Sequence, residues 1–108
     1  MSIGQGVLRM TFAYPSFTRR YKRSRPRMAV DGVEQRVTGW GSEIVTVPAG
    51  PHKIRVGVVP LDGGAEQGAA EAAVSVGVGA QIAVEYQAPR MRGSKGALRI
   101  VSVKAFGD

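Results

Sequence analysis

The chain has 108 residues, a length that fits one domain whose core is large enough to fold without metal ions or disulfides. It has no cysteine, which excludes disulfides, thiolate metal sites and cysteine nucleophiles. Fifteen Lys and Arg residues against eight Asp and Glu residues give a formal charge of +7, which favours anionic partners.

Most of the excess positive charge lies in one stretch near the N-terminus. Between Pro15 and Val30 the chain has no acidic residue, whereas the nine positive residues elsewhere nearly balance the eight acids. A local excess of this kind attracts an anionic partner by its field and does more than raise solubility. The stretch holds six positive residues: Arg19, Arg20, Lys22, Arg23, Arg25 and Arg27.

The first predicted strand runs from Val7 to Ala13, because its apolar residues alternate with polar ones in the period of a half-buried strand. Pro15 ends this strand. The basic stretch that continues to Arg27 has no consistent periodicity and contains Pro26, so we predict a loop there.

Two hairpins are predicted next along the chain. Asp31-Gly32 is typical of a two-residue hairpin turn and separates a strand at 28–30 from its return at 33–38. Further on, valine and isoleucine residues alternate with polar ones on both sides of Val47-Pro48-Ala49-Gly50. Proline at the second position of this tetrapeptide and glycine at its end suit a type I turn, which predicts a hairpin over Val45–Val59.

The rest of the chain continues as strands separated by turns. A strand is predicted from about Glu71 on, after a polar, glycine-rich loop at 61–68, and a tight turn at Gly77–Gly79 ends it. The remaining predicted elements are a strand over 82–86 that ends at Ala88-Pro89, a second basic loop at Arg90–Gly96 and a last strand over 98–103.

Seven to eight short strands, with no substantial helix, predict an all-β fold: a single antiparallel β-sandwich that spans residues 1–108. The N-terminal residues lack the features of a secretory signal, and no apolar run approaches the roughly 18 residues of a membrane span. We therefore expect a cytoplasmic protein, with peripheral attachment to a membrane as the alternative.

Two turns and their flanking strands resemble a known family. Val30-Asp31-Gly32, and Pro48-Ala49-Gly50-Pro51-His52 leading into an I-R-V strand, are similar to the turns of PEGA domains, over about residues 28–87. This resemblance implies a small, Ig-like β-sandwich in which the two turns sit on successive hairpins. It supplies no catalytic residue and is compatible with an accessory binding module. Trp40-Gly41 and the E-Y-Q-A-P run at 85–89 also resemble small uncharacterised actinobacterial proteins.

The residues do not predict catalytic chemistry. His52 is the only histidine, so no second imidazole or thiolate completes a zinc site or an acyl-transfer dyad. No pair of acids is visibly placed for acid–base work, and the run at 91–96 lacks the spacing of a phosphate-binding loop. We expect no cofactor, no metal and no enzymatic activity; an enzyme that uses Asp62 or Glu66 is the rival hypothesis.

Aromatic residues accompany the basic stretch and allow two interpretations. Tyr14, Phe17 and Tyr21 could stack on bases or lie among lipid headgroups while the cations neutralise phosphates. Alternatively, the stretch is solvated and its aromatic rings fold back onto the edge of the sandwich. Trp40, in a predicted loop at Gly39–Ser42, is either a plug whose N–H binds the backbone or an exposed contact residue.

The alternation of strand directions predicts where the loops lie. If successive strands run in opposite directions, the tight turns share one end of the sandwich, and both basic loops and Trp40 share the other. We therefore predict a non-catalytic interaction module that binds an acidic protein or an anionic surface. The alternatives are nucleic acid and anionic lipid. The candidate binding residues are Tyr14, Phe17, Arg19, Arg20, Tyr21, Lys22, Arg23, Arg25, Arg27, Trp40, Arg90, Arg92 and Lys95.

Overall fold

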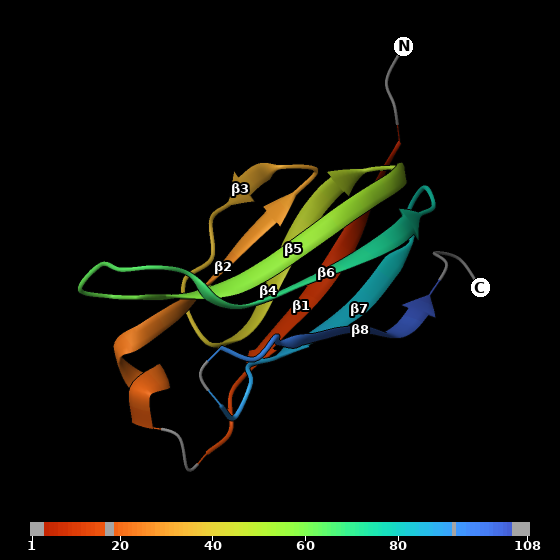
Figure 1. The fold of residues 1–108 in the computed structure, drawn as a ribbon. Coiled ribbons are helices and arrows are strands. Elements are labelled where there is room, and N and C mark those ends of the chain that lie inside the picture. Colours follow the sequence, from red (N-terminus) through yellow and green to blue (C-terminus); the bar gives the residue numbers. More distant parts are fainter. Residues whose placement is uncertain (1–3, 17–18, 92, 105–108) are drawn as a thin grey trace.

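The computed structural model describes residues 4–16, 19–91 and 93–104, with Arg20 described by its backbone alone. Its fold is all-β, as predicted: eight strands form two four-stranded sheets, with one short 3-10 helix, η1, between the first two strands (Figure 1). The elements are β1 (Gln5–Ala13), η1 (Arg19–Arg23), β2 (Ser24–Val30), β3 (Val33–Gln35), β4 (Gly41–Pro48), β5 (Gly50–Pro60), β6 (Gln67–Val76), β7 (Gln81–Gln87) and β8 (Ala97–Lys104).

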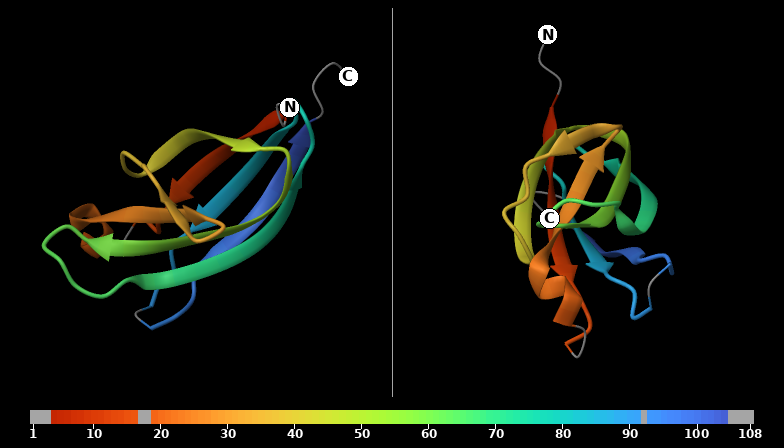
Figure 2. Two further views of the ribbon diagram at one scale, coloured as in Figure 1. Left: turned by 90° about the horizontal axis from the view of Figure 1, so that it is seen from above. Right: turned by 60° about the vertical axis from the view of Figure 1, so that its left-hand side comes forward.

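The two sheets pack face to face as a sandwich (Figure 2). One has the strand order β4-β1-β7-β8, and the other has the order β3-β2-β5-β6. Neighbouring strands are antiparallel, except that β1 and β7 pair in parallel over Val7–Ala13 and Gln81–Gln87. The expectation of uniformly antiparallel pairing is therefore wrong at this one pair, where two strands distant in sequence lie side by side.

The core lies between the sheets and follows the alternation seen in the sequence. In β1, Leu8, Met10 and Phe12 are at most 2% exposed, while Arg9 and Thr11 between them face solvent. Side chains from β2, β4, β5, β6 and β7 complete the core. Burial of such side chains removes apolar surface from water, at about 1.5–3 kcal/mol for each large one, and this holds the two sheets together.

The turn at Asp31-Gly32 forms as predicted. Val30 pairs with Val33, and the two residues between them have positive φ angles of 51° and 83°. Positive φ at both central positions is the geometry of a type I′ turn, which matches the right-handed twist of a hairpin.

The predicted hairpin over Val45–Val59 is wrong. β4 pairs with β1 in one sheet and β5 pairs with β2 and β6 in the other, so the turn at Pro48–Gly50 carries the chain between sheets. Gly50 has a φ of 129°, and the Ala49 amide donates to the Gly4 carbonyl at 2.7 Å. Proline and glycine reverse the chain direction, but they do not decide whether the second strand pairs with the first. The turn at Gly77–Gly79 crosses between sheets in the same way, from β6 to β7.

The basic stretch is not the loop that was predicted, because η1 and the first half of β2 occupy most of it. In β2, Ser24, Pro26 and Met28 are buried and alternate with exposed Arg25 and Arg27. Proline is tolerated there because β3 covers only the end of β2, from Met28 to Val30, so Pro26 faces an open edge on that side.

Three strand boundaries also differ from the prediction. β3 ends at Gln35 rather than at Thr38, β4 begins at Gly41, inside the predicted tryptophan loop, and β6 begins at Gln67 rather than near Glu71. These shifts leave the order of the elements unchanged.

Successive strands alternate in direction throughout the chain, as the strand pairings require. The tight turns after β2, β4 and β6 therefore share one end of the sandwich. The longer connections share the other, which we call the long-connection end: η1 and the segments 36–40, 61–66 and 88–96, as far as they are described (Figure 1). The predicted placement of the loops is confirmed.

Candidate binding surface

Three aromatic rings join the connections at the long-connection end. The ring centroids of Tyr14 and Trp40 lie 4.8 Å apart, and both rings contact Tyr21, at 5.5 and 5.7 Å. The Trp40 indole N–H donates to the carbonyls of Tyr21 and Ser24, at 3.1 and 3.0 Å. Trp40 is thus the plug with a backbone-bonded N–H that was one of its two predicted roles.

Tyr21 fixes η1 beside the β7–β8 connection. Its ring is 3% exposed, its hydroxyl donates to the Pro89 carbonyl, and its own carbonyl accepts a 2.8 Å hydrogen bond from Ser24 Oγ. The hypothesis that the Tyr21 ring stacks on a partner is therefore wrong, because the sandwich itself covers it. The same contacts bring the two basic segments together, as the alternation of strands predicted.

Five exposed cations lie on η1 and the segments beside it. Arg19, Lys22 and Arg23 belong to η1, Arg25 begins β2, and Lys95 lies in the β7–β8 connection. Among the residues described, no carboxylate lies within ion-pair distance of any of the five. Their charges are therefore turned to solvent without internal neutralisation.

The other predicted binding residues have different positions. Arg27 donates to Glu34 at 2.7 Å on the outer face of β2, so its charge is already balanced. Tyr14 is half-buried in the aromatic cluster, and Arg90 is exposed in the β7–β8 connection. Phe17, Arg92 and the Arg20 side chain lie outside the described part of the chain.

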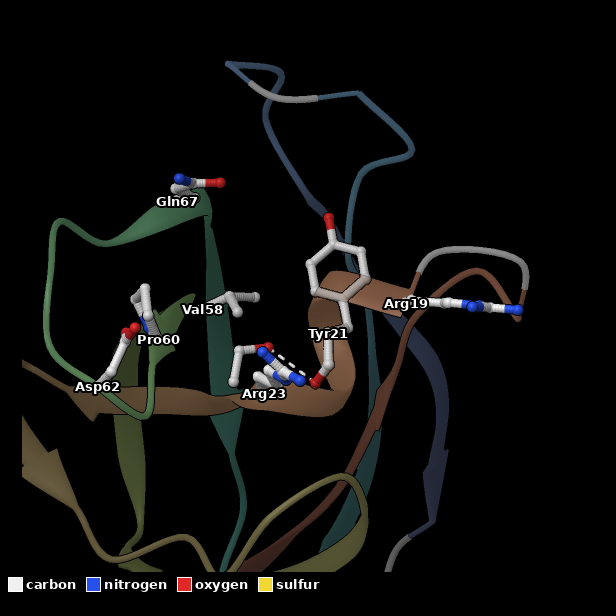
Figure 3. A pocket seen from close by; sticks show the side chains of 8 residues that line it. Arg19, Tyr21, Arg23, Val58, Pro60, Asp62 and Gln67 are labelled. Carbon is white, nitrogen blue, oxygen red and sulfur yellow. Dashed lines mark hydrogen bonds between the residues drawn. The ribbon is translucent and has the colours of Figure 1, made fainter.

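A pocket of about 510 Å³ opens beside η1, and no residue pattern predicted it directly. Figure 3 shows Asp62, Pro60 and Gln67 on one side, Tyr21 and Arg19 on the other, and Arg23 and Val58 between them. Its walls thus combine guanidinium groups with an apolar floor. The signal that could have located it is the predicted 61–68 loop, which the alternation of strands places at the basic end.

Several cations elsewhere on the molecule have acidic partners, whereas Arg9 and Lys104 form no ion pair within the described part of the chain. On the outer face of β5, Lys53 pairs with Glu71 at 3.4 Å, and Arg55 pairs with Glu66. On β8, Arg99 pairs with Glu85 at 3.5 Å. Exposed pairs of this kind contribute little to stability, but they cancel the local field. The unbalanced charge is therefore concentrated at the long-connection end.

Within the described residues, no helix is long and apolar enough to cross a membrane. Comparison with protein-family models, with curated proteins and with solved structures finds no match for this chain.

Proposed function

We propose that the chain is a non-catalytic interaction module that binds an acidic segment of a protein partner at its long-connection end. The observation that supports this most strongly is a set of exposed cations without carboxylate partners at this end. Arg19, Lys22, Arg23 and Arg25 lie on η1 and at the start of β2, and Lys95 lies in the β7–β8 connection. Positive side chains held on one rigid end add their potentials over about a Debye length, roughly 8 Å at physiological salt, and accelerate encounter with an anionic partner.

The neighbouring pocket favours a protein segment over nucleic acid. Binding of single-stranded nucleic acid uses aromatic faces on which bases stack, but the rings of Tyr21 and Trp40 are held against the sandwich. The pocket instead offers Val58 and Pro60 beside Arg23, with Arg19 on one side and Asp62 on the other (Figure 3). This lining suits an apolar side chain whose neighbouring carboxylates lie toward Arg19 and Arg23. Because a chain without cysteine needs no oxidising compartment, we place this interaction in the cytoplasm.

A binding assay separates the partner classes. A labelled acidic peptide of about ten residues, with one central leucine, should bind in fluorescence anisotropy more tightly than an RNA of equal charge. Anionic vesicles are tested in parallel by flotation at the same salt concentration, and the protein should bind them more weakly than it binds the peptide.

Charge reversal locates the interaction on the surface. The double variant Arg19→Glu/Arg23→Glu should lose at least about tenfold in peptide affinity. Arg9→Glu, a change of the same kind at an exposed position in the middle of β1, is the matched control and should bind nearly as the wild type does. Stronger binding to RNA or vesicles, or equal losses in both variants, would rule the proposal out.

A further inference from the structure

β8 forms an edge of its sheet and leaves apolar side chains exposed. Ile100, Val101 and Val103 are 44%, 54% and 65% exposed. Ile100 pairs with Val84 and Val103 with Ile82, both of which are 1% exposed, so these two β8 residues lie on the core-facing side of the sheet. The opposite sheet does not extend far enough to cover them.

The backbone along the outer edge of β8 is also available for pairing. Within the described residues, the backbone hydrogen bond on that side runs from Gly96 to the Gly68 carbonyl at 3.0 Å, just before the strand begins. From Ala97 to Lys104 the strand has no proline and no charge on its core-facing side. Proline and inward-pointing charges are two of the devices by which edge strands avoid association, and this edge lacks both. The strand does carry a bulge at Val101, where its register with β7 shifts, and this bulge puts Ile100 and Val103 on the same face. Arg99 and Lys104 lie on the opposite face, so the core-facing side of the edge is the one open to association.

We propose that β8 pairs antiparallel with β8 of a second copy of this chain, around a two-fold axis between Ile100 and Val101. The β4-β1-β7-β8 sheet of one copy and the same sheet of the second copy then form one continuous eight-stranded sheet. This register places Leu98 opposite Val103 of the second copy and Ile100 opposite Val101, so apolar residues meet apolar residues. A closed two-fold contact of this kind is self-complementary and ends at the dimer.

The charges on the strand favour a second copy as the occupant. In the proposed register Arg99 faces Ser102 and Lys104 faces Ala97, so no like charges lie directly opposite each other. Antiparallel pairing also directs the two long-connection ends away from each other, which keeps the unbalanced cations of the two copies apart.

β4 forms the other edge of the same sheet, and pairing of β8 with β4 of the next copy would build an open-ended chain. The β4 edge is less suited to such pairing. Glu43 in β4 accepts hydrogen bonds from the Thr38 amide, at 2.9 Å, and from the Thr38 hydroxyl, so the β3–β4 connection lies against this strand. Pro48 at the end of β4 has no N–H to donate. Pairing of β8 with β8 is therefore more favourable than pairing of β8 with β4 of another copy.

A β8 dimer would carry two copies of the basic surface at its opposite ends. A partner with two acidic segments could then engage both, and the second contact would form at the high effective concentration that the first one creates. The dimer itself does not depend on what the basic surface binds.

Sedimentation velocity over a range of protein concentrations tests the dimer. The wild type should shift from monomer to dimer, and Val101→Lys, which places two charges next to the axis, should remain a monomer. Ile44→Lys changes an apolar residue that is 69% exposed on β4 and should dimerise as the wild type does. A circular dichroism melt of each variant confirms that it is folded.

Cross-linking tests the register, because the chain has no cysteine of its own. A mixture of the single variants Arg99→Cys and Ser102→Cys should give a mixed disulfide dimer, whereas each variant alone should cross-link poorly, since its cysteines lie diagonally apart. A monomeric wild type, a Val101→Lys variant that still dimerises, or cross-linking of each variant alone as efficient as that of the mixture would overturn the proposal.

Discussion

His52 lies between two hydrogen-bond acceptors from different parts of the fold. Its Nδ1 is 2.6 Å from Asp31 Oδ2 in the β2–β3 turn, and its Nε2 is 2.6 Å from the Pro48 carbonyl at the end of β4. Only the doubly protonated imidazolium can donate to both. The sole histidine thus joins the two sheets at the tight-turn end, and it is structural, as its isolation in the sequence indicated.

The pKa values of this pair move in opposite directions. The hydrogen bond to Asp31, with a smaller contribution from the Pro48 carbonyl, raises the pKa of His52 above its usual 6.5. The Lys53 amide, which donates to Asp31 Oδ1 at 2.8 Å, lowers the pKa of Asp31 below its usual 3.8, and His52 lowers it further.

We predict that the bond contributes most to stability in mildly acidic solution. The His52 contribution is fully present below its unfolded pKa near 6.5 and is lost as the pH rises through the raised folded value. The Asp31 contribution is present above 3.8 and is lost as the pH falls through the lowered folded value. Urea unfolding of wild type and His52→Gln should therefore differ most between about pH 4 and pH 6.5, and less as the pH rises. A difference that stays constant from pH 5 to about pH 9 would contradict the imidazolium.

At the scale of elements, alternation of apolar and polar residues predicted the strands but not all their partners. The period of two located seven of the eight strands, and of β2 the sequence analysis placed only the end, at 28–30. Asp31-Gly32 predicted its own turn correctly, because two successive positive φ angles are typical of a tight hairpin. The turn at Pro48–Gly50 has no such feature. Whether β5 pairs with β4 or crosses to the other sheet depends on long-range pairing with β1 and β2, which local residues do not encode.

In the basic stretch, a single proline prevented the prediction of most of a strand. Ser24, Pro26, Met28 and Val30 alternate with exposed residues, so the period of β2 was present in the sequence. Pro26 concealed it, because proline is normally absent from paired strands. Its position at an unpaired edge of β2 could be known only after β3 had been placed.

The junction between β6 and β8 should be sensitive to a single methyl group. Tyr86, fully buried in β7, donates its hydroxyl to the Gly68 carbonyl at 2.6 Å, and Gly96 donates its amide to the same oxygen. A Cβ at Gly96 would lie 2.4 Å from that oxygen and 2.6 Å from the Tyr86 ring. We predict that Gly96→Ala lowers the free energy of unfolding by about 1–3 kcal/mol, because the buried backbone and ring must move.

Gly39→Ala is the matched control for this substitution. Nothing lies within 4 Å of a Cβ at Gly39, and its backbone is not in the left-handed region. Its effect on urea unfolding should stay within about 0.5 kcal/mol. If the two variants unfold at the same denaturant concentration, the close contact between Gly96 and Gly68 is absent in solution.

At the scale of the whole molecule, the alternation of strand directions predicted which end carries the candidate surface. That inference depends only on how many strands separate two loops. It therefore holds even though the predicted hairpin over Val45–Val59 is wrong. It did not predict the pocket at Val58 and Pro60. The inward turn of Tyr21 to Pro89 agrees with the second interpretation of the aromatic residues, in which they fold back onto the sandwich, but the contact with Pro89 was not predicted. Those features depend on side-chain packing between connections that are far apart in sequence.

The two basic segments should act on the same partner. We predict that Arg23→Glu in η1 and Lys95→Glu in the β7–β8 connection each weaken binding of the acidic peptide and each flatten its dependence on salt, because fewer charges attract the partner. Anisotropy titrations between about 50 and 200 mM salt measure both effects. If Lys95→Glu leaves affinity and salt dependence unchanged, η1 and β2 alone form the site.

A nuclear magnetic resonance titration shows residue by residue whether the long-connection end is the surface that binds. Amide shifts of the ¹⁵N-labelled protein are followed as the acidic peptide is added. The perturbed amides should lie in residues 19–25, 61–67 and 88–96, with the tight turns at 31–32, 48–50 and 77–80 unchanged. Perturbations centred on the tight-turn end or on the outer sheet faces, or no perturbation at low salt, would contradict it.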